Sequence, residues 1–281
     1  MYSANFDYIR ANSIDEALEL LGKHSNASLI AGGHSLIPAM KLRLTNPDLL
    51  IDIGRIGDLK GITSTSSRVH IGALTTHAEI AASDAVPAGL REAAGMVGDR
   101  QVRNRGTIGG NVSHADPASD LPTILAALEA KFHLTGPSGS RTVAASDFFE
   151  GFFETSKGKD EVLLAVEVYT TGGSAYEKLA NPASGYCMVG AGAVVTVSGG
   201  KCVSASVAVG GLTPGPVRCP SVEAALVGNR LDADTIAAAA KAVASDLPSD
   251  LIGDMHASED YRKAMASVYV KRALTKAAAR A

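Results

Sequence analysis

The chain has 281 residues, of which 46% are hydrophobic, 20% are charged and 5% are aromatic. This length suggests about two domains of ordinary size, and the composition is typical of a globular protein and excludes a disordered chain. With 26 Lys and Arg against 29 Asp and Glu, the net charge of −3 provides no basic field for a nucleic-acid backbone, so we expect no nucleic-acid partner.

No segment of the sequence has the pattern of a membrane span or a signal peptide. The longest apolar runs, such as residues 236–240, fall far short of the about 20 residues that cross a bilayer. Residues 1–7 lack the charged start and apolar stretch of a signal peptide. We therefore expect a cytoplasmic protein without a transmembrane segment.

The N-terminal part of the chain alternates between strand and helix patterns. Ser13 and Glu16 have the spacing of a capping box, in which the serine caps the third helical N–H and the glutamate reaches back. The helix that follows is expected to stop at Gly22, and Pro38 suits the first position of a second helix over 39–43. Short apolar runs predict strands at residues 6–9, 28–31 and 49–53.

The middle of the chain has a mixed pattern. A Gly-Pro-Ser-Gly turn separates residues 131–135 from 141–143, which predicts a hairpin. Further strands are expected at residues 68–72 and 161–169, and helices at 76–82, 88–95 and 121–128.

The C-terminal part is expected to be an antiparallel sheet backed by helices. Residues 172–174 have the composition of a linker, and residues 198–200 have that of a hairpin turn. The expected strands are 175–179, 188–197 and 202–210, and the expected helices are 221–227, 233–245 and 258–276.

The first glycine motif is Ile30-Ala31-Gly32-Gly33-His34-Ser35-Leu36, directly after a predicted strand. Successive glycines allow several backbone N–H groups to point into one concavity, which suits a phosphate. Ser35 adds a hydroxyl donor, and His34 adds a donor through its backbone or its ring. The simpler alternative is a tight strand–helix turn without a ligand.

The second motif is Gly106-Thr107-Ile108-Gly109-Gly110-Asn111, which offers a hydroxyl, two glycines and an amide side chain. We expect the two loops to hold one diphosphate between them. Arg100, Arg103 and Arg105 lie just upstream and raise the local potential. The alternative for each arginine is a solvated surface residue, which we prefer for Arg100.

Several common site motifs are absent. The chain has no P-loop sequence, no G-x-S-x-G elbow and no G-x-G-x-x-G, since residues 190–195 lack the third glycine. Three widely spaced cysteines without a C-x-x-C do not suit a zinc or iron–sulfur site. The seven histidines form no metal-binding pair at helical spacing, so we expect no metal ligand in this chain. No motif identifies an acid–base catalytic residue, and we name none.

Together, the two motifs resemble the FAD-diphosphate motifs of the molybdenum hydroxylase flavoproteins. This family includes the medium FAD subunit of carbon monoxide dehydrogenase and the FAD domain of xanthine dehydrogenase. The resemblance covers essentially the whole chain and includes residues 101–105, 116–122 and 175–179. Residues 31–41 and 198–203 resemble the carbon monoxide dehydrogenase branch, whereas residues 111–116 are more similar to nicotine- or xanthine-type relatives.

The resemblance implies an α+β fold. It consists of a two-subdomain FAD-binding fold of the vanillyl-alcohol oxidase type, followed by a C-terminal antiparallel sheet with helices. The expected FAD-binding domain spans residues 1–173, with subdomains at about 1–54 and 55–173. A C-terminal α+β domain is expected over residues 174–281.

The resemblance also implies roles for single residues. Asp120 is expected to contact the ribityl or ribose region, with a helix cap as the alternative. Leu163 is expected beside the adenine, with core packing as the alternative. Lys178 is expected near the flavin pyrimidine end, with a surface lysine as the alternative. Tyr186 is expected by the isoalloxazine ring, with an ordinary sheet residue as the alternative. The implied set around FAD is Ile30, Ala31, Gly32, Gly33, His34, Ser35, Leu36, Thr107, Ile108, Gly109, Gly110, Asn111, Asp120, Leu163, Lys178 and Tyr186.

The implied function is that of an FAD-carrying, electron-transferring subunit of a molybdenum hydroxylase. A large partner subunit would carry the molybdenum cofactor and a small one the [2Fe-2S] clusters, in a dimer of heterotrimers. FAD would pass electrons to a quinone, NAD or oxygen. Two alternatives stay open: a stand-alone FAD reductase resembling UDP-N-acetylenolpyruvylglucosamine reductase, and a flavin-free scaffold subunit.

Overall fold

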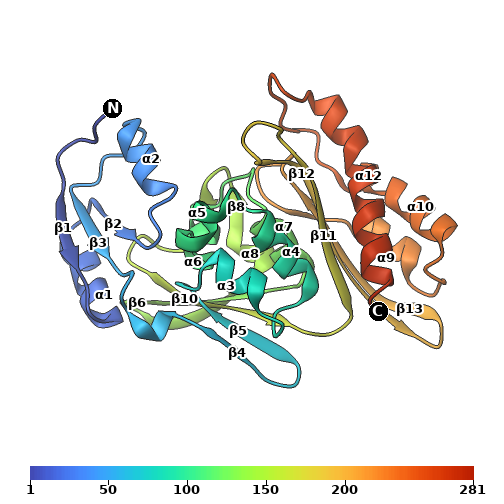
Figure 1. Cartoon of the computed structure of the whole chain (residues 1–281), viewed down its shortest axis with the longest axis horizontal. Coiled ribbons are helices and arrows are strands. Elements are labelled where there is room, and N and C mark those ends of the chain that lie inside the picture. The colour runs from blue at the N-terminus through green and yellow to red at the C-terminus, as the bar shows by residue number, and fades with distance from the viewer.

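Three main sheets follow one another along the chain (Figure 1). A hydrophobic cluster packs against each of them. The structure is a computed structural model that describes residues 1–281. The N-terminal sheet and the C-terminal helices lie at opposite ends of the molecule, with the helices α3–α8 between them (Figure 1). The mixed helix-and-sheet class expected from the sequence is confirmed.

The N-terminal sheet has three parallel strands in the order β1-β3-β2. Parallel strands need a crossover between them, and helices provide both crossovers. Its elements are β1 (Asp7–Arg10), α1 (Ile14–Lys23), β2 (Ala27–Ile30), α2 (Leu36–Lys41) and β3 (Leu49–Asp52).

The caps of these helices differ in detail from the sequence prediction. The Ser13 hydroxyl accepts from the N–H of Glu16 (3.1 Å), as expected, but the Glu16 carboxylate accepts from the N–H of Asn12 (2.7 Å) instead of Ser13. The second helix begins at Leu36, so Pro38 is its third residue and not its first. The third helical N–H has no partner inside a helix either, which is why proline is tolerated there.

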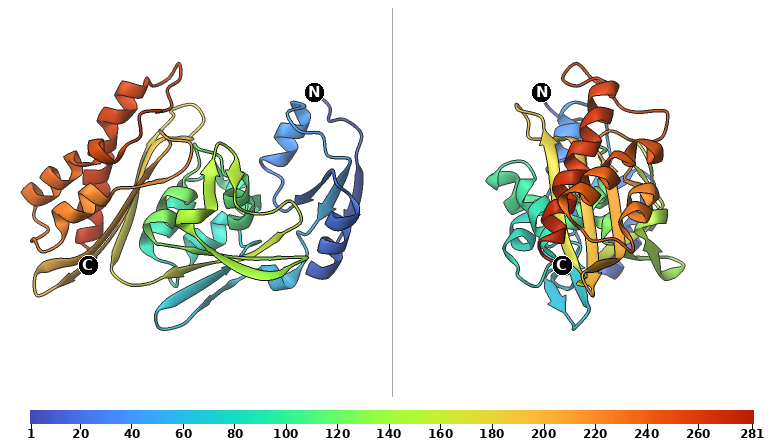
Figure 2. Two further views of the ribbon diagram at one scale, coloured as in Figure 1. Left: turned by 180° about the vertical axis from the view of Figure 1, so that it is seen from behind. Right: turned by 90° about the vertical axis from the view of Figure 1, so that its right-hand side faces the viewer.

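The second sheet is antiparallel, with strand order β4-β5-β10-β6-β7, and it includes the predicted hairpin. One of its faces packs against helices (Figure 2). The other face carries polar side chains. Its strands are β4 (Ile62–Ser64), β5 (Arg68–Gly72), β6 (Lys131–Gly136), β7 (Gly139–Ala144) and β10 (Val162–Tyr169). The helices of this part are α3 (His77–Ala82), α4 (Ala88–Met96), α5 (Arg100–Arg105), α6 (Ile108–His114), α7 (Leu121–Ala127) and α8 (Ala145–Phe148). The short elements are η1 (Gly57–Leu59), β8 (Phe149–Gly151) and β9 (Glu154–Thr155).

The third sheet is antiparallel, with order β11-β12-β13-β14, and helices cover both of its faces. Helix α12 packs on one face, while α4 and α7 from the middle part pack on the other (Figure 2). The strands are β11 (Gly173–Ala180), β12 (Cys187–Ser198), β13 (Lys201–Gly210) and β14 (Val217–Arg218). The helices are α9 (Pro220–Leu226), α10 (Ala233–Lys241), α11 (Val243–Asp246) and α12 (Glu259–Ala278).

Two predictions for this part are wrong. Gly173 and Ser174 are not a linker, because they pair with Val195 and Val194 in the sheet, and the buried Ser174 hydroxyl accepts from Gly89 N–H (3.1 Å). The helix expected over residues 233–245 is divided into α10 and α11 at Ala242. The hairpin at residues 198–200 is confirmed. None of the helices combines the length and the hydrophobicity that crossing a bilayer requires.

Candidate functional site

The first glycine motif forms the turn between β2 and α2. Gly33 has a φ of +73°, a left-handed conformation that glycine adopts without strain. The backbone N–H groups of residues 32–36 donate to no acceptor within the protein. The His34 ring instead lies 3.0 Å from the carbonyl oxygen of Gly32 through Nδ1. Five successive N–H groups without a protein acceptor are free donors of the kind that bind an anion.

The second motif is not a loop but the beginning of helix α6, with Thr107 as its N-cap. The N–H groups of Ile108 and Gly109 donate to the carbonyl oxygens of Thr75 (3.0 Å) and Ala73 (2.8 Å). The N–H of Gly110 donates to the Thr107 hydroxyl (3.1 Å). These N–H groups are therefore used inside the protein. What the motif can offer a ligand is the Thr107 hydroxyl hydrogen, the exposed face of Gly110 and the side-chain NH2 group of Asn111, whose Oδ1 atom accepts from the Ser119 hydroxyl (2.8 Å).

The structure brings the two motifs into direct contact. A Cβ atom at Gly32 would lie 2.1 Å from the carbonyl oxygen of Arg105 and 3.0 Å from the Cα atom of Gly106. No side chain fits in that space, so glycine at position 32 allows the two backbones to touch. The two motifs therefore lie side by side, which the expected binding of one diphosphate between them requires.

The upstream arginines have different environments. Arg103 donates from one nitrogen to the carbonyl oxygens of Val97 and Gly98 (both 2.9 Å), which holds the segment before α5. Arg100 and Arg105 are exposed and form no ion pair within the chain. Arg105 is the one whose backbone meets the first motif, so it is the better placed of the two to raise the potential there.

His77 lies behind the second motif and was not predicted as part of the site. Its backbone N–H donates to the carbonyl oxygen of Gly106 (3.0 Å), its side chain is buried, and its Nδ1 atom has no hydrogen-bond partner. Burial, together with the nearby Arg103 guanidinium, lowers the pKa of His77 to about 4. The only sequence signal was its place after Thr76, which caps α3 in a capping box with Glu79.

We expect His77 to make the protein sensitive to acid. Because its pKa is lowered from 6.5 to about 4 in the folded state, the unfolded chain takes up the proton first as the pH falls. The contribution of neutral His77 to the free energy of unfolding is then fully present above pH 6.5. As the pH falls to 4, the free energy of unfolding decreases by about 3 kcal/mol through this group. Urea unfolding at a series of pH values measures this, and His77→Leu should flatten the curve in that window. His24→Leu, at an exposed histidine, is the control; an equally steep curve for His77→Leu contradicts the assignment.

Asp120 and Lys178 form a buried ion pair between the middle part and the C-terminal sheet. The Lys178 ammonium group lies 2.9 Å from Asp120 Oδ1, and both side chains are 6% exposed. The Lys178 ammonium group also donates to the carbonyl oxygens of Met96 (3.0 Å) and Gly185 (2.8 Å). The Tyr176 hydroxyl donates to the Asp120 carboxylate (2.9 Å). Burial raises the pKa of Asp120, and the Lys178 cation opposes this rise. The pair therefore ties the loop before β12 to helix α4.

This pair corrects two alternatives from the sequence. The Asp120 side chain forms no cap hydrogen bond with α7, and Lys178 is not a surface lysine. Tyr186 is not a sheet residue either: it ends the loop between β11 and β12, and the residue is 57% exposed. Leu163 is buried in the main hydrophobic cluster, so core packing describes its present contacts. The roles of these four residues at a cofactor stay predictions.

The comparisons with known proteins decide the family. The family described as "FAD binding domain in molybdopterin dehydrogenase" matches residues 4–169, and the "CO dehydrogenase flavoprotein C-terminal domain" matches residues 174–277. The chain belongs to the FAD-binding medium subunits of the molybdenum hydroxylases.

Relatives of this medium subunit match over their full length. The carbon monoxide dehydrogenase medium chain of Afipia carboxidovorans is 40% identical, with 100% of this chain and 99% of the relative covered. The glyceraldehyde dehydrogenase medium chain of Sulfolobus acidocaldarius is 38% identical, with 99% and 100% covered. A solved structure of carbon monoxide dehydrogenase from Hydrogenophaga pseudoflava, which lacks the Mo-pyranopterin moiety, matches with a TM-score of 0.94 and 41% identity, covering 100% of this chain and 99% of that chain.

The residues of the two motifs fit the diphosphate of FAD. Residues 32–36 present five N–H groups without protein acceptors, and the contact at Gly32 places the Thr107–Asn111 segment beside them. A doubly anionic group needs several donors in one place, which this turn provides. FAD supplies the redox chemistry when bound; the side chains and backbone of this medium subunit bind and orient it.

We expect Tyr186→Ala to affect the flavin more than the fold. Loss of an aromatic contact worth about 0.5–1.5 kcal/mol would weaken FAD binding by about 2- to 10-fold and change the rate of reoxidation by oxygen. Because the side chain is exposed, the free energy of unfolding should change by no more than about 0.5 kcal/mol. Tyr186→Phe keeps the ring and is the control. Unchanged affinity and reoxidation rate in the alanine variant, at matched FAD occupancy, would contradict contact with the flavin.

Proposed function

We propose that this medium subunit relays electrons within a larger complex. Electrons would enter from [2Fe-2S] clusters of a small subunit, after substrate oxidation at the molybdenum cofactor of a large subunit, and leave from FAD to a quinone, NAD or oxygen. The observation that carries the proposal is the turn of five unpaired N–H groups held against the second motif. The proposed assembly is a dimer of heterotrimers.

The cysteines support the division of cofactors among subunits. Cys187, Cys202 and Cys219 are all buried, and no group of three potential ligands in the chain includes any of them. Burial raises the pKa of Cys187 to about 12 and that of Cys219 still further. Buried thiols of this kind are poor ligands and poor nucleophiles. An iron–sulfur cluster that feeds FAD would therefore belong to another chain.

The relatives support a substrate site outside this chain. Medium chains of a carbon monoxide dehydrogenase and of a glyceraldehyde dehydrogenase are about equally similar to it, at 40% and 38% identity. Two such different substrates share one type of medium chain, which is expected if the substrate binds elsewhere. The large subunit of the proposed complex would therefore bind the reducing substrate and determine its identity.

The two alternatives have less support. A stand-alone reductase needs a proton donor at its site, and His77, the buried titratable group next to the motifs, has a pKa of about 4 and is neutral at pH 7. In a flavin-free scaffold water would satisfy the N–H groups of residues 32–36, and that alternative does not explain why these donors lie against the second motif. We also propose a domain boundary near residue 173, supported by two hydrophobic clusters that lie mostly on either side of it, although Tyr176 and Ala208 belong to the cluster of the middle part. The proposed location is cytoplasmic, free or held by the complex at the inner face of the membrane.

The test compares the isolated subunit with the complete complex. The FAD-loaded subunit is mixed anaerobically with carbon monoxide, and separately with purines, N-heterocycles and aldehydes, while the visible flavin absorbance is recorded. We expect no bleaching by any of these alone, and bleaching by one of them in the complete complex. Bleaching of the isolated subunit would overturn the relay and favour the stand-alone reductase, whereas a subunit that takes up no FAD in the complete complex would favour the scaffold.

A further inference from the structure

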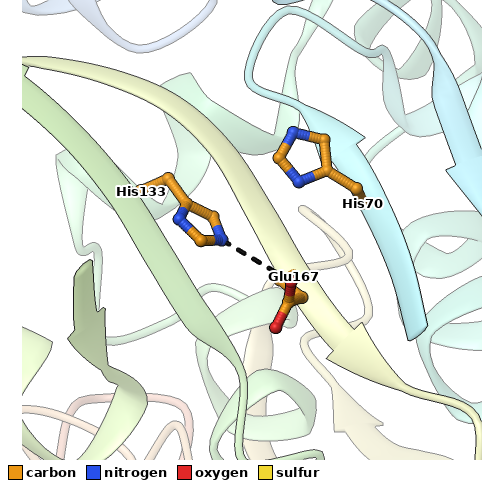
Figure 3. Close-up of side chains that lie close together, drawn as sticks. All are labelled: His70, His133 and Glu167. Carbon is orange, nitrogen blue, oxygen red and sulfur yellow. Dashed lines mark ion pairs between the residues drawn. The ribbon is translucent and has the colours of Figure 1, made fainter. Parts of the chain in front are cut away.

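Three potential metal ligands meet on the polar face of the second sheet (Figure 3). His70, Glu167 and His133 come from the neighbouring strands β5, β10 and β6, and their ligand atoms all lie within 4.8 Å of one another. Glu167 is directly opposite His70 in the register, and the His133 Nε2 atom lies 3.9 Å from a Glu167 oxygen. None of these residues belongs to the two glycine motifs.

The neighbours of these residues follow from strand alternation. Val69, Val166 and Phe132 point to the opposite face and are fully buried in the main cluster. Side chains alternate between the two faces of a strand, so His70, Glu167 and His133 necessarily share the other face. The central position of β10 holds the three side chains close together.

His133 has an unused nitrogen in this cluster. Its Nδ1 atom lies 3.1 Å from the Thr142 hydroxyl, which orients the ring, while its buried Nε2 atom has no hydrogen-bond partner. A metal-binding histidine usually makes one hydrogen bond through its other ring nitrogen. Nε2 points towards the Glu167 carboxylate, so the free nitrogen and the carboxylate face each other as two ligands of one metal ion do (Figure 3).

The nearby cations leave one carboxylate oxygen for this cluster. The Arg68 guanidinium lies 3.5 Å from Glu167 Oε1, whereas His133 faces Oε2. Arg68 and Lys131 also lie over the ring of Tyr169, at 5.4 and 5.7 Å from its centroid. Cation–π attraction to Tyr169 stabilises both cations at the side of the cluster, although their charge lowers the affinity for a metal cation.

We propose that His70, His133 and Glu167 bind one zinc-class divalent transition-metal ion, with water or an external group as the fourth ligand. Two imidazoles and a carboxylate are a known zinc ligand set with one open position. Bonds of about 2.0–2.1 Å require ligand atoms closer together than they are now, and the exposed His70 is free to move in. A bound ion would link β5, β10 and β6 and stabilise the sheet.

The metal-free, full-length subunit is titrated with zinc chloride, and binding is measured by calorimetry. A second titration uses cobalt chloride, and binding is measured by visible absorbance. We expect one ion per chain and a rise in the unfolding temperature. His70→Ala and His133→Ala should each weaken binding by about 100-fold or more, since even loss of an outer partner costs about 10- to 100-fold.

Controls separate this site from general histidine binding. His24→Ala and His256→Ala remove exposed histidines elsewhere on the surface and should leave the zinc affinity unchanged. Because His70 is exposed, His70→Ala is expected to fold even if His133→Ala does not, and Glu167→Gln offers a variant of equal size. Absence of stoichiometric zinc binding, or the same affinity in His70→Ala as in the unmodified chain, would overturn the proposal.

Discussion

Gly32→Val is expected to abolish FAD binding. A side chain at this position meets the backbone of Arg105 at 2.1 Å, so the turn that carries the five unpaired N–H groups has to move away from the second motif. Loss of two N–H bonds to a charged oxygen, at about 1.5–3 kcal/mol each, corresponds to binding about 100-fold weaker or worse. The measurement is FAD titration of the purified, FAD-depleted variant, with circular dichroism to show that it is folded.

Gly22→Val is the matched control for this experiment. Gly22 is exposed near the end of α1, and a Cβ atom there would contact nothing within 4 Å. The same change of side chain should therefore leave FAD affinity intact. Wild-type affinity in a folded Gly32→Val protein would contradict the site.

Gly110→Val tests the second motif separately. Gly110 is exposed, its N–H is already bonded to the Thr107 hydroxyl, and a Cβ atom at position 110 would lie 3.0 Å from that hydroxyl oxygen. A loss of FAD binding would therefore come from the new side chain, either by contact with the cofactor or by displacement of the Thr107 hydroxyl. Full FAD occupancy in a folded Gly110→Val protein would show that this part of α6 does not touch the diphosphate.

Lys178→Met is expected to lower the free energy of unfolding by about 3–5 kcal/mol, because it leaves the Asp120 carboxylate buried without its partner. That is a large share of the about 5–15 kcal/mol that stabilises a typical domain. It also frees the carbonyl oxygens of Met96 and Gly185, so the loop that carries Tyr186 loses its attachment to α4. Urea unfolding of the FAD-depleted protein measures the effect without a contribution from cofactor binding.

A second substitution, Asp120→Asn, distinguishes loss of the ion pair from a general loss of stability. Asp120→Asn removes the charge and keeps a carbonyl acceptor for the Tyr176 hydroxyl. The double variant should therefore be more stable than Lys178→Met alone, a positive coupling in a double-mutant cycle. Lys201→Met, at an exposed lysine, is the control. If the Lys178→Met protein were as stable as this control, the ion pair would not contribute to the free energy of unfolding.

Features with local causes could be predicted from the sequence. The strands at the hairpins of residues 131–144 and 187–210 follow from turn residues between alternating apolar runs. The start of α1 follows from the Ser13 hydroxyl and the N–H of Glu16, which lie three residues apart. The turn at residues 30–36 is local too, since a strand running into two glycines is enough to predict it.

Features with non-local causes were missed or assigned differently. The pairing of Gly173 and Ser174 with Val195 and Val194 depends on a strand further along the chain, so composition alone indicated a linker. The N–H groups of Ile108 and Gly109 are used by Thr75 and Ala73, which nothing within the motif reveals. Which glycine motif keeps its donors free is therefore decided by the partners that the fold supplies.

The Asp120–Lys178 pair and the cluster of His70, His133 and Glu167 likewise could not be predicted from the sequence. Asp120 and Lys178 were identified singly through a family resemblance, but their ion pair exists only because β11 lies beside α4, and α7 packs on the neighbouring strand β12. His70, His133 and Glu167 have no recognisable spacing, and the histidine pattern predicted no metal site. The sequence by itself determined the local turns, caps and glycine motifs, because those depend on residues a few positions apart. Only the tertiary structure decided which distant side chains share one sheet face or one buried pair, because strand register and helix packing set those distances.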